Sequence, residues 1–156
     1  MLETKNLRND FTATGYITNP ERTKIILVRH NKFNTWLPPG GHMEINELPH
    51  ECVLREVEEE IGINADIVQH GEQLNLNSAS ERQIPTPYCI LHELIPASSR
   101  DVEHMHVDFI YVMVSPECAA SLQVREISDA KWLTKEEICS INTFAPVKEI
   151  AKKLLR

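Results

Sequence analysis

Apolar and polar positions along the chain predict short strands on both sides of one amphipathic helix. Runs rich in β-branched and aromatic residues, bounded by Pro, Gly and Asn, indicate strands at 11–17, 24–30, 63–70, 88–95, 104–115 and 126–133. Helical patterns cover about 46–61, 135–140 and 145–155. Strands on both sides of a central helix, followed by closing helices, predict a mixed α/β sandwich.

The central helix has recognisable ends and two distinct faces. Asn46 is a suitable N-cap, with Glu47 in the acidic first turn, and Gly62 can take the left-handed conformation that ends a helix. At about 100° per residue, the apolar side chains and three carboxylates fall on neighbouring stripes. The apolar stripe contains Val53, Leu54, Val57 and Ile61, and the acidic stripe contains Glu56, Glu59 and Glu60. We expect this helix to pack on a sheet with its carboxylates at the edge of the contact.

Two segments are expected to be irregular. Leu37-Pro38-Pro39-Gly40-Gly41 precedes the helix, and its glycines would let backbone approach a ligand or ion closely. The polar stretch at 71–87 is long for a loop in a compact domain, which is typical of a functional or mobile segment.

Composition narrows the class of protein. A chain of 156 residues and 17.9 kDa is expected to form one domain, residues 1–156. It has no apolar run long enough to span a membrane and no secretory pattern at its start, so we expect a cytoplasmic protein. The four cysteines form no CxxC pair, which argues against a zinc finger or a disulfide framework. The sequence leaves the oligomeric state open, a homodimer included.

The acidic charge is concentrated around the central helix. The net charge is −7, and residues 41–63 hold seven acids against the single base Arg55. Such a surface is a poor partner for a nucleic acid polymer. Adjacent carboxylates repel one another unless a cation neutralises them, and hard oxygen ligands suit Mg²⁺ or Mn²⁺. Arg55 can hold a carboxylate in place, with Glu51 and Glu59 each four residues away.

These residues resemble the Nudix box, Gly-x5-Glu-x7-Arg-Glu-U-x-Glu-Glu-x-Gly-U, where U is a bulky aliphatic residue. Residues 41–63 match every defined position, reading Gly41-x5-Glu47-x7-Arg55-Glu56-Val57-x-Glu59-Glu60-x-Gly62-Ile63. The resemblance implies a Nudix-type α/β/α sandwich with a mixed β-sheet. It also implies hydrolysis of a nucleoside diphosphate linked to another moiety, by attack of water at phosphorus.

The same resemblance implies roles for individual residues. Glu56, Glu59 and Glu60 would ligate a divalent metal together with the Gly40 carbonyl, and Arg55 would orient the cluster. The metal would screen the phosphate charge and lower the pKa of the attacking water. The proton acceptor differs among members of the family, and Glu56 is the first choice here, with Glu59 second.

Residues outside the box are candidates for substrate binding. Arg29 could meet phosphate and Trp36 could stack on a base, although packing roles serve both residues equally well. Glu103 could provide an accessory carboxylate. On a strand, His104, His106 and Asp108 would share one face. They could form a second metal site, but a polar strand end near the substrate, or a simply exposed one, is preferred.

The substrate is less defined than the reaction. The neighbourhood that often carries a proline in ADP-ribose pyrophosphatases, or a tyrosine in dinucleoside polyphosphate hydrolases, reads Asn77-Ser78-Ala79-Ser80-Glu81 and fits neither. We therefore favour a nucleoside triphosphate, oxidised nucleotides included, cleaved to monophosphate and pyrophosphate. The alternatives are a nucleotide-sugar or ADP-ribose-type diphosphate, and a catalytically silent Nudix-fold module that binds nucleotides.

Overall fold

The computed structural model describes residues 7–31, 33–74, 76, 78–99, 101–122 and 127–156. Its elements follow the predicted order, with strands before and after one long helix and two helices at the end. In chain order they are β1 Asn9–Thr18, β2 Lys24–His30, β3 Thr35–Leu37, β4 Gly40–His42, α1 Pro49–Ile61, β5 Asp66–Ile67, β6 Cys89–Ile95, β7 His104–Val114, β8 Ile127–Thr134, α2 Lys135–Ser140 and α3 Ala145–Leu154.

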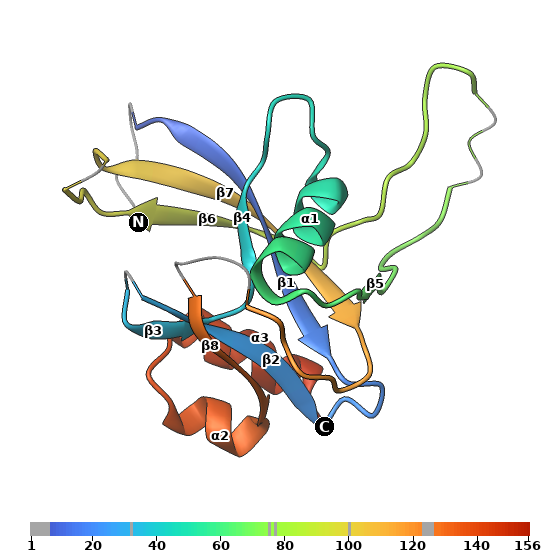
Figure 1. Ribbon diagram of the computed structural model, residues 1–156. Coiled ribbons are helices and arrows are strands. Elements are labelled where there is room, and N and C mark those ends of the chain that lie inside the picture. Colours follow the sequence, from blue (N-terminus) through green and yellow to red (C-terminus); the bar gives the residue numbers. More distant parts are fainter. Residues whose placement is uncertain (1–6, 32, 75, 77, 100, 123–126) are drawn as a thin grey trace.

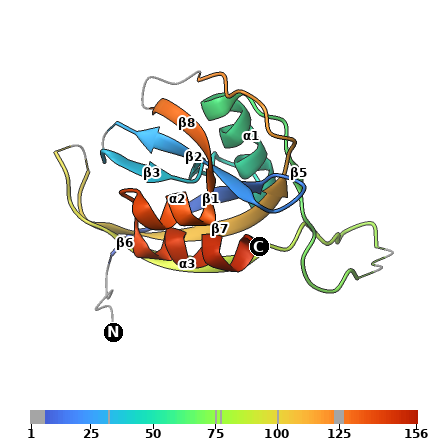
Figure 2. The same ribbon diagram turned by 90° about the horizontal axis from the view of Figure 1, so that it is seen from below.

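The strands form one mixed sheet with helices on both faces. The main path of the sheet is β3-β2-β1-β7-β5, while β4 pairs with β1, β6 with β7 and β8 with β2. Figure 2 shows α1 on one side of the sheet and α2 with α3 on the other. The predicted α/β/α sandwich is therefore confirmed. No helix in the described part of the chain is long and apolar enough to cross a membrane.

Side-chain alternation along the strands builds one core on each face. On β1, Ala13 and Ile17 pack toward α1, whereas Tyr16 packs toward α3. Gly15 lies directly under α1, because a Cβ there would meet the Val53 and Val57 side chains at 3.1 and 3.3 Å. Both faces of the sheet are buried over its central part, and polar side chains collect at its ends.

β1 is the strand against which the glycine segment and β7 align. It pairs in antiparallel fashion with β4, where Thr12 lies opposite His42, and in parallel with β7, where Asp10 lies opposite His106. Figure 1 shows β1, β4 and β7 running together beneath α1. This order brings the start of β1, the end of β4 and the start of β7 into one region.

The glycine segment is more regular than the sequence predicts. Only Pro38 and Pro39 interrupt it, since Leu37 ends β3 and Gly40 begins β4. An added Cβ at Gly40 would lie 2.5 Å from the Ala13 carbonyl oxygen and 2.8 Å from the Thr14 Cα. The glycine therefore serves close strand pairing rather than an irregular turn.

The start of α1 and one of its faces also differ from the prediction. The helix begins at Pro49, with Leu48 at the N-cap, and Asn46 instead takes a left-handed backbone conformation with φ 67°. Glu47 therefore precedes the helix. Leu54 lies outside the core and is 39% exposed, whereas Val53, Val57 and Ile61 are buried. Gly62 ends the helix in the left-handed conformation as predicted.

The predictions for three other segments are confirmed at least in part. The strand predicted at 63–70 is limited to Asp66–Ile67, which pairs with the last residues of β7. The described residues between 71 and 87 form no helix or strand, as predicted, and Figure 1 shows this segment projecting from the body of the protein. The strand predicted from 126 begins at Ile127, and residue 126 itself lies outside the described residues.

Candidate active site

Arg55 is the centre of the acidic cluster. Its Nε and Nη2 donate to the two Glu47 carboxylate oxygens at 2.8 and 2.9 Å. Its Nη1 donates to Glu56 at 2.7 Å and to Glu59 at 3.1 Å. The predicted pairing with Glu59 is present, but that with Glu51 is not. Glu51 instead accepts the Leu48 N–H at 3.0 Å and caps the helix, because α1 begins two residues later than predicted.

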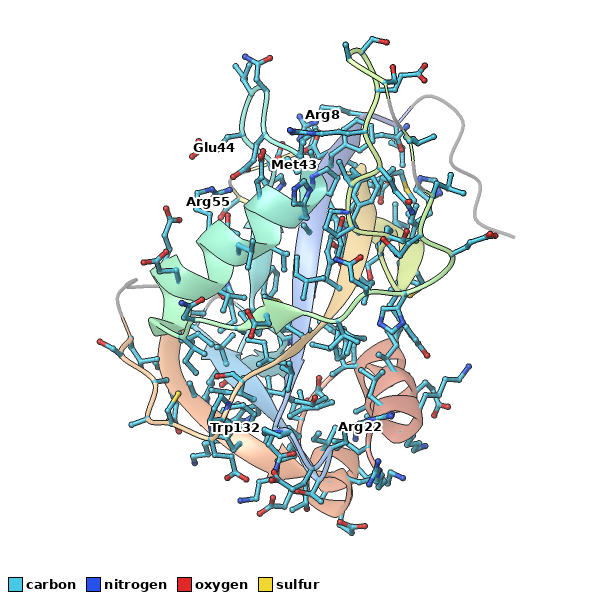
Figure 3. The ribbon with its side chains drawn as sticks, turned by 90° about the vertical axis from the view of Figure 1, so that its right-hand side faces the viewer. Arg8, Arg22, Met43, Glu44, Arg55 and Trp132 are labelled. Carbon is cyan, nitrogen blue, oxygen red and sulfur yellow. The ribbon has the colours of Figure 1, made fainter. Side chains whose placement is uncertain are left out.

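Arg55 also ties α1 to the end of β4. Its Nη2 donates to the His42 carbonyl at 3.0 Å. Figure 3 shows Arg55 beside the segment of Met43 and Glu44, which leads from β4 into the helix. One guanidinium thus connects the strand, the segment after it and two glutamates of the helix, as its planar fork of donors allows.

Glu56 and Glu60 lie along the glycine strand. A Cβ at Gly41 would fall 2.6 Å from the Glu56 carboxylate, so only glycine leaves room for that group. Burial raises the pKa of Glu56, while the hydrogen bond and charge of Arg55 oppose this rise. Glu60 is 9% exposed and accepts the Gly40 N–H at 3.3 Å. Glu59 lies further out, with 55% of its side chain exposed.

Arg29 and Trp36 are in a different place from the box glutamates. Both line a pocket of about 610 Å³ formed by β2, β3, β8 and α2, together with Lys131, Leu133, Glu136, Glu137, Ser140 and Ile141. The Lys131 ammonium lies 5.3 Å from the centre of the Trp36 ring, and Arg29 donates to the Asn34 side chain at 2.8 Å. The pocket combines an aromatic face with two cations and two carboxylates.

Glu103 and His104 separate although they are adjacent in sequence. Glu103 is exposed just before β7, whereas His104 is 5% exposed at its start. His104, His106, Asp10 and His42 form a cluster. His106 and His104 lie on one strand face as predicted, but the burial of His104 contradicts the simply exposed strand end that the sequence also allowed. Burial, with the neighbouring His42 and His104, lowers the pKa of His106 to about 4.

Two further carboxylates lie on the same face of the sheet, Asp108 buried and Glu93 partly buried. Asp108 accepts hydrogen bonds from the Thr12 hydroxyl at 2.9 Å and the Thr14 hydroxyl at 2.8 Å. Burial, and then the charge of Asp108, raise the pKa of Glu93 to about 7. The alternation of polar residues on 104–108 is a sequence signal for Asp108. Asp10, His42 and Glu93 carry no comparable local signal, because strand pairing alone brings them to this face.

Comparisons with known proteins identify the family of this chain. The family model described as NUDIX domain matches residues 9–156, and the chain therefore belongs to the Nudix family. The asymmetrical bis(5′-nucleosyl)-tetraphosphatase of Rattus norvegicus is 28% identical over 126 residues, which cover 80% of this chain and 72% of the relative. This chain is accordingly a hydrolase that acts on phosphoric anhydrides.

Solved structures show the same fold. A Nudix-family hydrolase from Clostridium perfringens superimposes with a TM-score of 0.77 at 28% identity, covering 95% of this chain and 97% of the other. An Ap4A hydrolase from C. elegans has a TM-score of 0.62 at 17% identity, covering 92% and 93% of the two chains. At that identity the second likeness supports the fold alone.

Proposed function

We propose that the protein is a divalent-metal-dependent pyrophosphohydrolase that acts on a nucleoside polyphosphate. The observation that carries the proposal is the arrangement of Glu56, Glu59 and Glu60 around Arg55 and Gly40. One guanidinium contacts three carboxylates, Glu47 included, so negative charge remains in excess there. Carboxylate and carbonyl oxygens are the donors that Mg²⁺ and Mn²⁺ prefer, and the donor set therefore fits such an ion.

In this proposal Glu56, Glu59, Glu60 and the Gly40 carbonyl hold the metal. A bound Mg²⁺ or Mn²⁺ supplies charge screening for the phosphates and lowers the pKa of the attacking water. Glu56 accepts the proton of that water, and Glu59 is the alternative acceptor. Arg55 fixes the direction of the Glu56 carboxylate through their 2.7 Å hydrogen bond. Water adds to phosphorus, the anhydride bond breaks, and the leaving phosphate departs with the bonding electrons.

The residues outside the box are assigned to substrate binding. Trp36 stays a candidate for stacking on a nucleobase and Arg29 for contacting phosphate, although their pocket under α2 lies apart from the box glutamates. Glu103, exposed just before β7, would be an accessory carboxylate. His104 remains a substrate-binding candidate, although its side chain is buried. The proposal takes residues 1–156 as one domain in the cytoplasm, where the free thiols Cys52, Cys89, Cys118 and Cys139 would persist.

Two substrate classes follow from different observations. The absence of the dinucleoside and ADP-ribose sequence signatures favours a nucleoside triphosphate, cleaved to monophosphate and pyrophosphate. Similarity over 80% of the chain to an asymmetrical bis(5′-nucleosyl)-tetraphosphatase favours a dinucleoside tetraphosphate instead. Nucleotide sugars and ADP-ribose stay on the list of compounds to be tested.

The test is hydrolysis of a substrate panel with Mg²⁺ or Mn²⁺. The panel holds nucleoside triphosphates, oxidised nucleotides, dinucleoside polyphosphates, nucleotide sugars and ADP-ribose, and chromatography identifies the products. Pyrophosphate release identifies the first class, whereas a nucleoside triphosphate plus a monophosphate identifies the second. We expect Glu56→Gln to lower the rate by about 100- to 10,000-fold, as loss of a general base does.

Two controls make the result specific. Glu60→Gln should also abolish turnover, whereas Glu58→Gln, an exposed position on the same helix, should leave it unchanged. A protein that binds panel nucleotides in calorimetry but hydrolyses none would overturn the proposal in favour of a silent binding module.

A further inference from the structure

Three histidines and one aspartate meet where β1 starts, β4 ends and β7 starts. One side-chain atom from each of Asp10, His42, His104 and His106 lies within 4.8 Å of all the others. His104 Nε2 and His106 Nε2 are 3.2 Å apart. The Asp10 carboxylate lies 3.8 Å from His104 Nε2 and 3.9 Å from His42 Nε2. Four candidate donor atoms therefore lie close together.

The spacing fits a four-coordinate metal ion. Zn–N distances of about 2.0–2.1 Å in a tetrahedron place neighbouring ligand atoms about 3.4 Å apart. The 3.2 Å separation of the two imidazole nitrogens is close to this value. The other separations, which reach at most 4.8 Å, need to shorten by a few tenths of an ångström to about 1.4 Å. His42 is 61% exposed and provides a route for the ion to enter and for such adjustment.

The surrounding groups orient these ligands. His104 Nδ1 lies 2.8 Å from the Val102 carbonyl oxygen, which can only accept a hydrogen bond. Nδ1 therefore carries the proton, and Nε2 keeps its lone pair for the cluster. Arg8 donates to both Asp10 oxygens at 2.7 and 2.8 Å and to Asp101 at 2.9 Å. A carboxylate has about four lone-pair positions, so Asp10 can bind Arg8 and an ion together.

The chemistry of the cluster favours a cation over a phosphate. The Asp10 carboxylate stands among the histidines and would repel an anion. Three imidazoles with one carboxylate suit Zn²⁺ and related transition metals, whereas Mg²⁺ prefers oxygen ligands.

The cluster and the Nudix glutamates belong to opposite faces of the sheet. Gly41 faces Glu56 on α1, so its neighbour His42 points to the other face. Asp10 alternates with Thr12, Thr14 and Tyr16 on β1, and Tyr16 packs on the α3 side. Figure 3 shows Arg8, which directly precedes β1, and Arg55 on α1.

We propose that Asp10, His42, His104 and His106 form a second metal site, specific for Zn²⁺-type ions and separate from the Nudix box. Four protein ligands make a closed site, which is typical of structural zinc. The ion would fasten the ends of β1, β4 and β7 together on the side of the sheet away from α1.

The experiment measures metal binding by the full chain after removal of metals with a chelator. Calorimetry with Zn²⁺ gives stoichiometry and affinity, and Co²⁺ gives the coordination geometry from its visible spectrum. We expect one site per chain with the intense bands of tetrahedral Co²⁺. His106→Gln and His42→Gln should each weaken Zn²⁺ binding by more than about 100-fold, since even outer-shell partners are worth about 10- to 100-fold.

Matched variants separate this site from the box. The double variant Glu56→Gln/Glu60→Gln should keep the tetrahedral spectrum, and so should His92→Gln, an exposed histidine on β6. Circular dichroism of the metal-free variants shows whether each has folded. Of the two histidine variants, His42→Gln is expected to disturb folding less than His106→Gln, because the His42 side chain is exposed. Zn²⁺ binding that is lost with the glutamates and retained in the histidine variants would overturn the proposal, as would octahedral Co²⁺ alone.

Discussion

Arg55 and Glu47 form a two-pronged ion pair across the start of α1, with N–O distances of 2.8 and 2.9 Å. Both side chains are largely buried, with 22% of Arg55 and 12% of Glu47 exposed. Because Glu47 precedes the helix and Arg55 lies on its second turn, the pair fixes the connection between the glycine strand and the metal-binding face. Two parallel N–H···O bonds set a direction as well as a distance.

This pair should make stability depend on pH in the acid range. The hydrogen bonds from Arg55 lower the pKa of Glu47 from 4.5 to about 2. Its contribution is complete above pH 4.5 and disappears as the pH falls through about 2. We expect Glu47→Gln to lower the free energy of unfolding by about 1–3 kcal/mol at neutral pH. This loss should shrink as the pH falls from 4.5 to about 2. Urea unfolding in the presence of a chelator measures it.

The exposed Glu44 offers the control for this measurement. Glu44→Gln keeps the backbone N–H that donates to Glu47 and should change stability little at any pH. A Glu47→Gln deficit that stays constant down to about pH 2 would show that the carboxylate charge contributes nothing.

Substitutions at the two glycines should separate stability from activity. A Cβ at Gly40 meets backbone atoms of Ala13 and Thr14, which can move only if β4 shifts. We expect Gly40→Ala to cost about 1–3 kcal/mol of stability. A Cβ at Gly41 meets only the end of the Glu56 side chain, which can swing away. Gly41→Ala should therefore lower the hydrolysis rate by about 100-fold, through misplacement of Glu56, with a stability change within about 1 kcal/mol.

Thermal unfolding and rates on the best panel substrate check both glycine variants. Equal losses of stability in the two would contradict the assignment of Gly40 to strand pairing and of Gly41 to Glu56.

Local patterns predicted α1 and its carboxylates because both depend on residues close in sequence. The end of the helix at Gly62 and the contacts of Arg55 with Glu56 and Glu59 needed only the helical period. Of the cluster of Asp10, His42, His104 and His106, only the placement of His104 and His106 on one strand face could be predicted from the sequence. The four residues come together only because β1 lies between β4 and β7. Pairing between strands that are distant in sequence produces no local pattern from which it could be predicted.

Leu54 shows where the helical period itself misleads. It shares the predicted apolar stripe with Val57, yet it is 39% exposed, whereas Val57 is 1% exposed. The helical period of about 100° per residue gives the direction of a side chain but not the extent of the sheet beneath it. We expect Val57→Ala to cost about 2 kcal/mol and Leu54→Ala less than about 1 kcal/mol. Urea unfolding distinguishes these values, and an equal cost would place Leu54 in the core after all.

Glu93 should act on stability in the opposite direction from Glu47. Burial and the charge of Asp108 raise its pKa from 4.5 to about 7, so the native protein holds a proton that the unfolded chain releases. Stability therefore falls as the pH rises from 4.5 to about 7 and then stays at the lower level. Glu93→Gln should stabilise the protein by about 1 kcal/mol above this range, a value reduced because the side chain is partly exposed. The gain should vanish below pH 4.5, whereas Glu21→Gln, at an exposed turn, should give no such dependence. The check is the free energy of unfolding measured from below pH 4.5 to above about pH 7 in the presence of a chelator. A gain that persists below pH 4.5 would show that Glu93 is ionised in the native protein throughout.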